Sequence, residues 1–158
     1  LLIRSQKVSL HHLAQFREDV EGIVAAHAAR NHAPADIQKL KDLLATAHAY
    51  INEGSSRRNA FIDIDKQVHL TMAKITGNPV YLSVLNSIHD NIHRYYDRFL
   101  SMEKPELEEN YNDLCDLVDA IENGDVDLAR KVAKQHVQRF NQYMKKREID
   151  GESGNRNL

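Results

Sequence analysis

The sequence has little of what several classes of protein require, with one cysteine, three prolines, six glycines and no tryptophan in 158 residues. The single Cys115 excludes an internal disulfide and a cysteine-rich zinc site, and is typical of a reducing compartment. No apolar run approaches the roughly 20 residues that span a bilayer, and the first ten residues lack the pattern of a signal peptide. We therefore expect a cytoplasmic protein without membrane contact.

The charge balance is also close to even, with 21 basic and 23 acidic side chains and a formal net charge of −2. Proteins that grip a phosphate backbone usually carry a basic excess or stripe. We do not expect this segment to bind nucleic acid by itself. Because the sequence opens at Leu1 rather than at a methionine, we expect it to be a piece of a longer protein.

Helical periodicity dominates what is present, and no stretch shows sustained strand alternation. Glycine and proline fall mainly where helices would begin or end. The pattern predicts an all-α bundle over residues 10–148, followed by a disordered, Gly/Ser/Asn-rich tail over 149–158. The six predicted helices run from about Ser9 to His32, Pro34 to Gly54, Asn59 to Thr76, Pro79 to Phe99, Pro105 to Asn123, and from Asp125 past Met144.

Polar residues on the flank of the third predicted helix are the first candidates for a site. Its apolar stripe is centred near Val68, with Asp65 about 60° and His69 about 100° away. A carboxylate so close to an apolar stripe is costly unless it is paired. An aspartate and a neutral imidazole four residues apart can reach one metal ion, but the spacing alone favours an ordinary helical salt bridge.

Other polar positions have similarly ordinary interpretations when position alone is considered. His136 lies inside an apolar stripe, where a lone histidine is more often a hydrogen-bonded core residue than a ligand. His89 and His93 are interpreted as a partly exposed, weakly basic edge. Arg17 and Glu21 are interpreted as a solvated i, i+4 ion pair, although Arg17 could instead point inward and receive a carboxylate in bidentate fashion.

Enzyme motifs are missing from the sequence. It contains no glycine-rich phosphate loop, no Gly-x-Ser-x-Gly elbow, no His-Glu-x-x-His and no Glu-x-x-His pairs of the di-iron type. Cys115 lies beside an apolar stripe and is expected to be inert. We therefore predict that the chain is not an enzyme.

Several short motifs occur in a specific order along the chain. They are FREDVE at 16–21 followed by VAA at 24–26, DKQVH at 65–69 running on to GNP at 77–79, and DAIENGD at 119–125 followed by Ala129 and His136. Together they resemble the C-terminal effector-binding (FCD) domain of FadR-type regulators in the GntR family. The resemblance covers about residues 10–146.

The resemblance implies a six-helix antiparallel bundle around a central ligand cavity, often with a divalent metal (Zn, Ni, Mn or Fe). The implied metal ligands are Asp65, His69 and His136. A fourth ligand, a histidine in the family pattern, falls on Leu114, which cannot bind a metal. His89, His93 or a bound effector could supply that ligand, and Arg17, His93 and Leu114 are the implied effector-binding residues.

The implied function is that of the ligand-sensing and dimerising domain of a bacterial transcriptional regulator. Its effector would be a small metabolite, expected to be a carboxylate. DNA contact would belong to an N-terminal winged-helix domain that this sequence does not contain, with residues 1–9 as the end of its linker. Three alternatives remain: a metal-free pocket for an apolar or acyl ligand beside Leu114, a metal-dependent enzyme, and a purely structural bundle.

Overall fold

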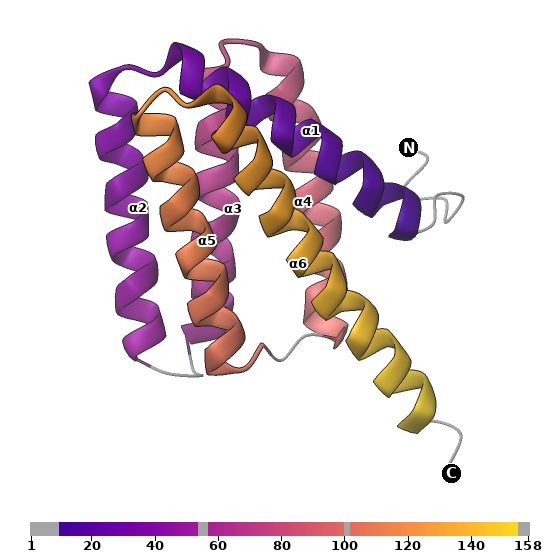
Figure 1. Cartoon of the computed structure of the whole chain (residues 1–158). Coiled ribbons are helices and arrows are strands. Elements are labelled where there is room, and N and C mark those ends of the chain that lie inside the picture. Colours follow the sequence, from indigo (N-terminus) through magenta and orange to yellow (C-terminus); the bar gives the residue numbers. More distant parts are fainter. Residues whose placement is uncertain (1–9, 54–56, 100–101, 155–158) are drawn as a thin grey trace.

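The computed structural model describes residues 10–53, 57–99 and 102–154, and these ranges contain helices and no strand. The helices are α1 (Leu10–Asn31), α2 (Pro34–Asn52), α3 (Arg58–Ile75), α4 (Pro79–Phe99), α5 (Lys104–Glu122) and α6 (Val126–Gly154). Consecutive helices run in opposite directions (Figure 1). The predicted all-α six-helix bundle is therefore confirmed. Within the described ranges, no helix is both long and apolar enough to cross a membrane.

The helix ends follow the punctuation of the sequence. Before α2, the Asp36 carboxylate accepts a hydrogen bond of 2.8 Å from the backbone N–H of Ala33, which caps the helix beside its N-terminal proline. Gly77 and Gly124 adopt positive φ values of 70° and 65° after α3 and α5, a conformation that disfavours residues with a Cβ. Asp125 accepts a 3.0 Å hydrogen bond from a backbone N–H in the first turn of α6, as a helix N-cap does.

The last helix is longer than the predicted bundle. α6 runs to Gly154, whereas the sequence pattern placed the end of the bundle at residue 148. Residues 145–149 (KKREI) are mostly good helix formers, so the helix continues through them and past Gly151. The predicted linker at 1–9 and residues 155–158 of the predicted tail lie outside the described residues.

Close packing of α1 against α6 forms one side of the bundle. Gly22 of α1 is buried, and a Cβ built there would lie 2.8 Å from Cγ of Lys134 on α6. The stem of Lys134 thus crosses α1 at the glycine, and its ammonium reaches Asp19 at 3.1 Å. The absence of a side chain at residue 22 allows this close approach.

The core draws apolar side chains from all six helices. Fully buried examples from successive helices are Val24, Leu40, Val68, Leu85, Leu114 and Ala133. This apolar packing supplies most of the favourable free energy of folding. It also encloses a group of ionisable side chains that five of the helices bring to the centre of the bundle.

Candidate functional site

A buried ionisable cluster lies where α1, α3, α4, α5 and α6 meet. Five of its members are at most 2% exposed, and the carboxylates of Asp65 and Asp113 are each 13% exposed. Burying so many polar groups costs free energy unless each finds a partner. We call this group the central cluster; it comprises Arg17, Glu21, Asp65, His69, His89, Asp113 and His136.

One half of the central cluster contains three ligand-type atoms that face one another without hydrogen bonds. Asp65 Oδ1 lies 3.2 Å from His136 Nε2 and 3.8 Å from His69 Nε2. Each of these three atoms is buried and has no hydrogen-bond partner of suitable geometry. All three lie within 4.8 Å of one another. Buried polar atoms without a hydrogen bond are rare in proteins, and an ion, a water molecule or a ligand could satisfy these three.

These three atoms fit a divalent cation. Zinc binds histidine nitrogen and carboxylate oxygen at about 2.0–2.2 Å, so its ligand atoms lie roughly 3–4 Å apart. The separations of 3.2 and 3.8 Å between Asp65 Oδ1 and the two Nε2 atoms fall in that range. Asp65, His69 and His136 would hold the ion, and three protein ligands leave a coordination position open for a ligand oxygen.

The other half of the cluster is fully hydrogen-bonded around Glu21. His69 Nδ1 donates to Glu21 Oε2 at 2.6 Å, and His89 Nε2 donates to Glu21 Oε1 at 2.9 Å. Arg17 Nε also reaches Oε1 at 3.3 Å. His69 thus belongs to both halves, and its ring centroid lies 5.1 Å from those of both His89 and His136.

The electrostatics of the Asp65 half favour opposite charges in the absence of a metal. Burial alone would raise the pKa of Asp65, but His136, His69 and Arg17 outweigh it and hold that pKa well below its ordinary value. Burial would lower the pKa of His136, yet the facing carboxylates of Asp113 and Asp65, 3.7 and 3.2 Å from its ring nitrogens, raise it to about 9. A metal bound by His136 would therefore have to displace a proton.

In the Glu21 half, the carboxylate is charged and a neighbouring imidazole is neutral. Burial would raise the pKa of Glu21, but His69 and His89 hold it well below its ordinary value. Burial lowers the pKa of His89 to about 4, with Arg17 and His69 contributing in the same direction against Glu21. An ionised Glu21 accepts hydrogen bonds only, so the ring nitrogens that face it carry protons.

Arg17 joins the two halves. Its side chain is 2% exposed and its Nη1 has no hydrogen-bond partner, while its guanidinium carbon lies 4.9 Å from the centre of the Phe140 ring. The interpretation of Arg17 and Glu21 as a solvated ion pair is therefore wrong, since both side chains are buried. An unpaired guanidinium nitrogen in this position can bind an incoming carboxylate.

The structure brings together four of the six site residues predicted from the sequence: Arg17, Asp65, His69 and His136. Leu114 is fully buried in the apolar core. The side chain of His93 lies outside the described residues. Whether any of these six contacts an effector or metal remains a prediction.

Sequence reasoning undervalued or missed the remaining members of the cluster. The sequence pattern predicts a partly exposed edge at His89, but the side chain is only 2% exposed, so this prediction is wrong. Its position one turn after Leu85 and next to Ile88 was the available signal. Asp113, which was not singled out, lies with Oδ2 3.7 Å from His136 Nδ1 and also binds Arg139 at 3.0 Å. No short motif marks that carboxylate.

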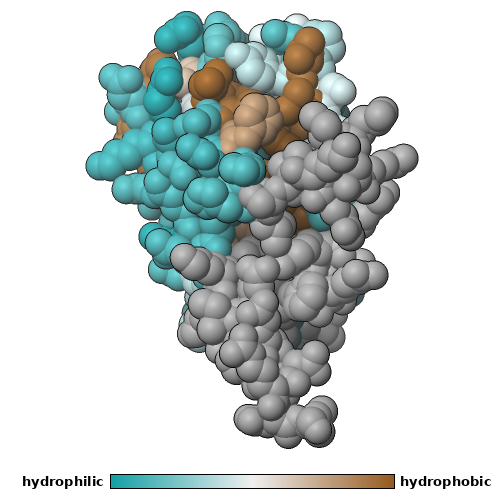
Figure 2. Space-filling view, turned by 90° about the vertical axis from the view of Figure 1, so that its right-hand side faces the viewer, coloured by the Kyte–Doolittle hydropathy of each residue, from teal (hydrophilic) through white to brown (hydrophobic). Residues whose placement is uncertain are grey.

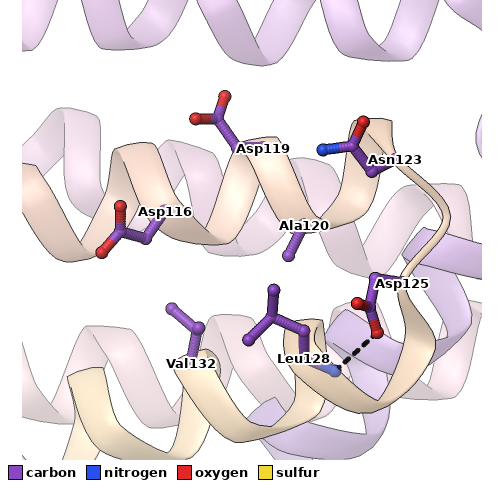
Figure 3. A pocket seen from close by; sticks show the side chains of 7 residues that line it. All are labelled: Asp116, Asp119, Ala120, Asn123, Asp125, Leu128 and Val132. Carbon is purple, nitrogen blue, oxygen red and sulfur yellow. Dashed lines mark hydrogen bonds between the residues drawn. The ribbon is translucent and has the colours of Figure 1, made fainter.

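A surface pocket of about 350 Å³ lies apart from the central cluster, between the end of α5 and the start of α6 (Figure 3). Asp125 there already caps α6. The pocket contains no residue of the central cluster and is not the predicted central cavity. Its lining consists of Asp116, Asp119, Ala120, Asn123, Asp125, Leu128 and Val132.

The described residues thus form an all-α bundle with histidines, carboxylates and one arginine buried at its centre. The family model for the FCD domain matches residues 12–139. The chain belongs to this family, which confirms the resemblance to the FadR-type effector-binding domain of GntR-family regulators.

Individual relatives agree with this assignment. The chain is 29% identical over 103 residues to a fatty acid metabolism regulator protein of Shewanella frigidimarina (strain NCIMB 400), covering 55% of this chain and 41% of that protein. This family and its relative are regulators, which confirms the prediction that the chain is not an enzyme. The chain thus spans less than half the length of this curated relative.

Two solved structures share the fold at low sequence identity. E. coli McbR/YncC superposes with a TM-score of 0.75 at 17% identity, covering 88% of this chain and 66% of that chain. Streptococcus agalactiae GntR superposes with a TM-score of 0.70 at 18% identity, covering 82% of this chain and 56% of that chain. The fold of this chain is therefore shared with both of these proteins.

Proposed function

We propose that this domain senses a small carboxylate metabolite at the central cluster, with a divalent metal held by Asp65, His69 and His136. The observation that carries the proposal is the set of three buried, mutually facing ligand atoms without hydrogen bonds. A bound cation would satisfy all three, and an open coordination position would receive one carboxylate oxygen of the effector. Because Leu114 replaces the fourth ligand of the family pattern, the effector would complete the coordination.

Arg17 would supply the second contact to the effector. Its unpaired Nη1 lies in the same buried cluster as the proposed ligands, and its charge is close enough to influence Asp65, His89 and His136. A guanidinium can hold a carboxylate by two parallel hydrogen bonds. The metal and Arg17 together would select anionic over neutral ligands, while the surrounding apolar core would limit their size.

Regulation would arise in the whole protein, of which this chain is one domain. We propose a homodimer that binds DNA through a separate N-terminal domain in the bacterial cytoplasm. Effector binding would favour one arrangement of the dimer, with a coupling free energy of about 1–3 kcal/mol.

Apolar residues of α1 and α4 are exposed, including Phe16, Ile23 and Val80. A hydrophobic area lies near the upper end of the face that these helices share (Figure 2). This surface supports dimerisation.

A second candidate ligand is an apolar or acyl compound bound without metal. Two observations favour it: Leu114 stands where the family pattern has a ligand, and the matched relative is named a fatty acid metabolism regulator. Under this alternative, Asp65 and His136 would form a buried pair beside an apolar cavity. Ligand binding would then be unaffected by a chelator.

Elemental analysis of the purified chain before and after EDTA tests the proposal directly. We expect about one divalent metal per chain in the wild type and none in His136→Ala. The matched control is His48→Ala, because His48 is an exposed histidine outside the cluster. Absence of metal even after reconstitution with excess zinc, nickel or manganese would reject the metal site and direct ligand screening to apolar and acyl compounds.

A further inference from the structure

Glu21 is the most completely buried carboxylate of the central cluster, and both of its oxygens are occupied. Oε2 accepts from His69 Nδ1 at 2.6 Å, whereas Oε1 accepts from His89 Nε2 at 2.9 Å and faces Arg17 Nε at 3.3 Å. Its side chain is 0% exposed. Glu21 therefore differs from Asp65, whose Oδ1 has no hydrogen bond.

The bond from His69 to Glu21 determines which nitrogen of His69 is available on the opposite side. A neutral imidazole carries one proton, and a charged carboxylate can only accept. With the proton on Nδ1, the lone pair of Nε2 faces Asp65 and His136, 3.8 Å from Asp65 Oδ1. Carboxylates that orient histidine ligands in this way are common beside metal ions.

We infer that Glu21 is a positioning residue that fixes the tautomer and ring orientation of His69, and that His89 in turn holds Glu21 in place through its Nε2 proton. This inference rests on the proposed function for its use in metal binding. It also predicts a property of the metal-free chain, the position of the proton on His69. His89 therefore acts two steps away from the proposed ion and is not one of its ligands.

A competing assignment is that Glu21, His69 and His89 themselves hold a cation, since their ligand atoms also lie within 4.8 Å of one another. The hydrogen bonds argue against it. The Glu21 oxygens already accept protons from both imidazoles, and the facing atoms of this trio are not among the buried unpaired atoms. A metal there would have to replace two good charge-assisted hydrogen bonds, whereas a metal at Asp65 would meet three atoms that have no hydrogen bond of suitable geometry and would displace one proton, from His136.

The test combines tautomer measurement with zinc affinity on the 158-residue chain. Imidazole nitrogen-15 NMR reports which ring nitrogen is protonated, and competition with a chromophoric chelator reports zinc affinity. The main variant is Glu21→Gln, whose amide offers one oxygen and one NH₂ where the carboxylate offered two acceptors. At least one of the two imidazoles facing it must then change its protonated nitrogen. Glu122→Gln, an exposed carboxylate paired with Lys41, is the matched control.

We expect Glu21→Gln to weaken zinc binding by roughly 10–100-fold, the usual effect of losing an orienting partner. His89→Leu should also weaken binding, and His89→Gln should restore it, because a glutamine N–H can replace the imidazole Nε2–H. These two variants keep the inference testable if Glu21→Gln fails to fold. The control should leave both tautomers and affinity unchanged.

Two results would overturn the inference. One is that Glu21→Gln keeps the wild-type tautomers and zinc affinity. The other is a stoichiometry of two zinc ions per chain, with one lost in Glu21→Gln, which would make Glu21 a ligand.

If the wild type binds no zinc, the proposed metal site fails, but the tautomers of the metal-free chain still decide the role of Glu21. An Nδ1–H form of His69 in the wild type, with a tautomer changed by Glu21→Gln, would support it.

Discussion

His69 and His136 stack with their ring centroids 5.1 Å apart, and the Nε2 atom of each is buried without a hydrogen-bond partner. The same Asp65 oxygen faces both nitrogens, at 3.8 and 3.2 Å. Two imidazoles and a carboxylate whose facing atoms make no hydrogen bond to one another could serve as ligands of one metal ion. This convergence is the basis of the first prediction.

Replacing Asp65 by asparagine should remove most zinc affinity. The amide is uncharged and binds zinc more weakly than a carboxylate, so the loss should exceed the roughly 10–100-fold that accompanies loss of an outer-shell partner. Competition with a chromophoric chelator measures this loss of zinc affinity. Asp63→Asn, two residues earlier on the exposed side of α3, is the control and should bind zinc as the wild type does. Equal affinities in the two variants would remove Asp65 from the ligand set.

Introducing histidine at Leu114 should strengthen zinc binding. The family pattern places a fourth ligand at this position, and a fourth nitrogen would complete a tetrahedral site. We expect at least tenfold tighter binding, with the metal-free protein destabilised by about 1–3 kcal/mol because a polar ring enters the core. Leu117→His is the matched control, since Leu117 is equally buried on the same helix. It should show the same destabilisation without tighter zinc binding. An equal gain in zinc affinity in both variants would contradict the assignment of Leu114 to the fourth ligand position.

Much of the fold could be predicted from the sequence because the helix ends are marked locally. Gly77, Gly124 and the N-terminal prolines of α2 and α5 stand where the chain turns, so each boundary depends on a few neighbouring residues. The end of α6 was less predictable. Residues after 148 contain glycines but no strong stop, so the helix runs on to Gly154.

The candidate site was only partly predictable, for a physical reason. Periodicity shows which side of a helix is apolar, but it does not show whether a neighbouring helix covers the polar flank. Arg17, Glu21 and His89 lie on such flanks and are buried because several helices converge on them. Asp65 and His69 stand out by their i, i+4 spacing, but that spacing alone favours an ordinary salt bridge, so the ligand set with His136 was predicted from the family resemblance.

The stability of the metal-free chain should fall as the pH rises from about 6.5 to 9. The pKa of His136 is raised to about 9 from 6.5 by Asp113 of α5 and Asp65 of α3, against burial and the charge of Arg17 on α1. Its contribution is therefore fully present below pH 6.5 and is lost as the pH rises through 9, by about 3 kcal/mol. Urea unfolding in EDTA at several pH values measures this loss.

His136→Gln should flatten this pH dependence, whereas His48→Gln should retain it. Two other groups of the cluster, His89 and Asp65, lose their contributions at lower pH than this window. The pKa of His89 is lowered to about 4, so its contribution is lost only as the pH falls below 6.5, and that of Asp65 is lost at still lower pH. If the unfolding free energy of His136→Gln depended on pH as steeply as that of the wild type, a group other than His136 would be responsible for the pH dependence.

Removing Asp65 and His136 together should separate stability from metal binding. The single change His136→Leu leaves the Asp65 carboxylate buried with fewer partners and should cost about 3–5 kcal/mol. The double variant Asp65→Leu with His136→Leu removes both charges and the unpaired atoms of these two side chains, so its unfolding free energy in EDTA should equal or exceed that of the wild type. Zinc should raise the Tm of the wild type, by the equivalent of about 2.7 kcal/mol at 100 times Kd, but not that of the double variant. A double variant less stable than His136→Leu would instead show that the pair is retained for folding.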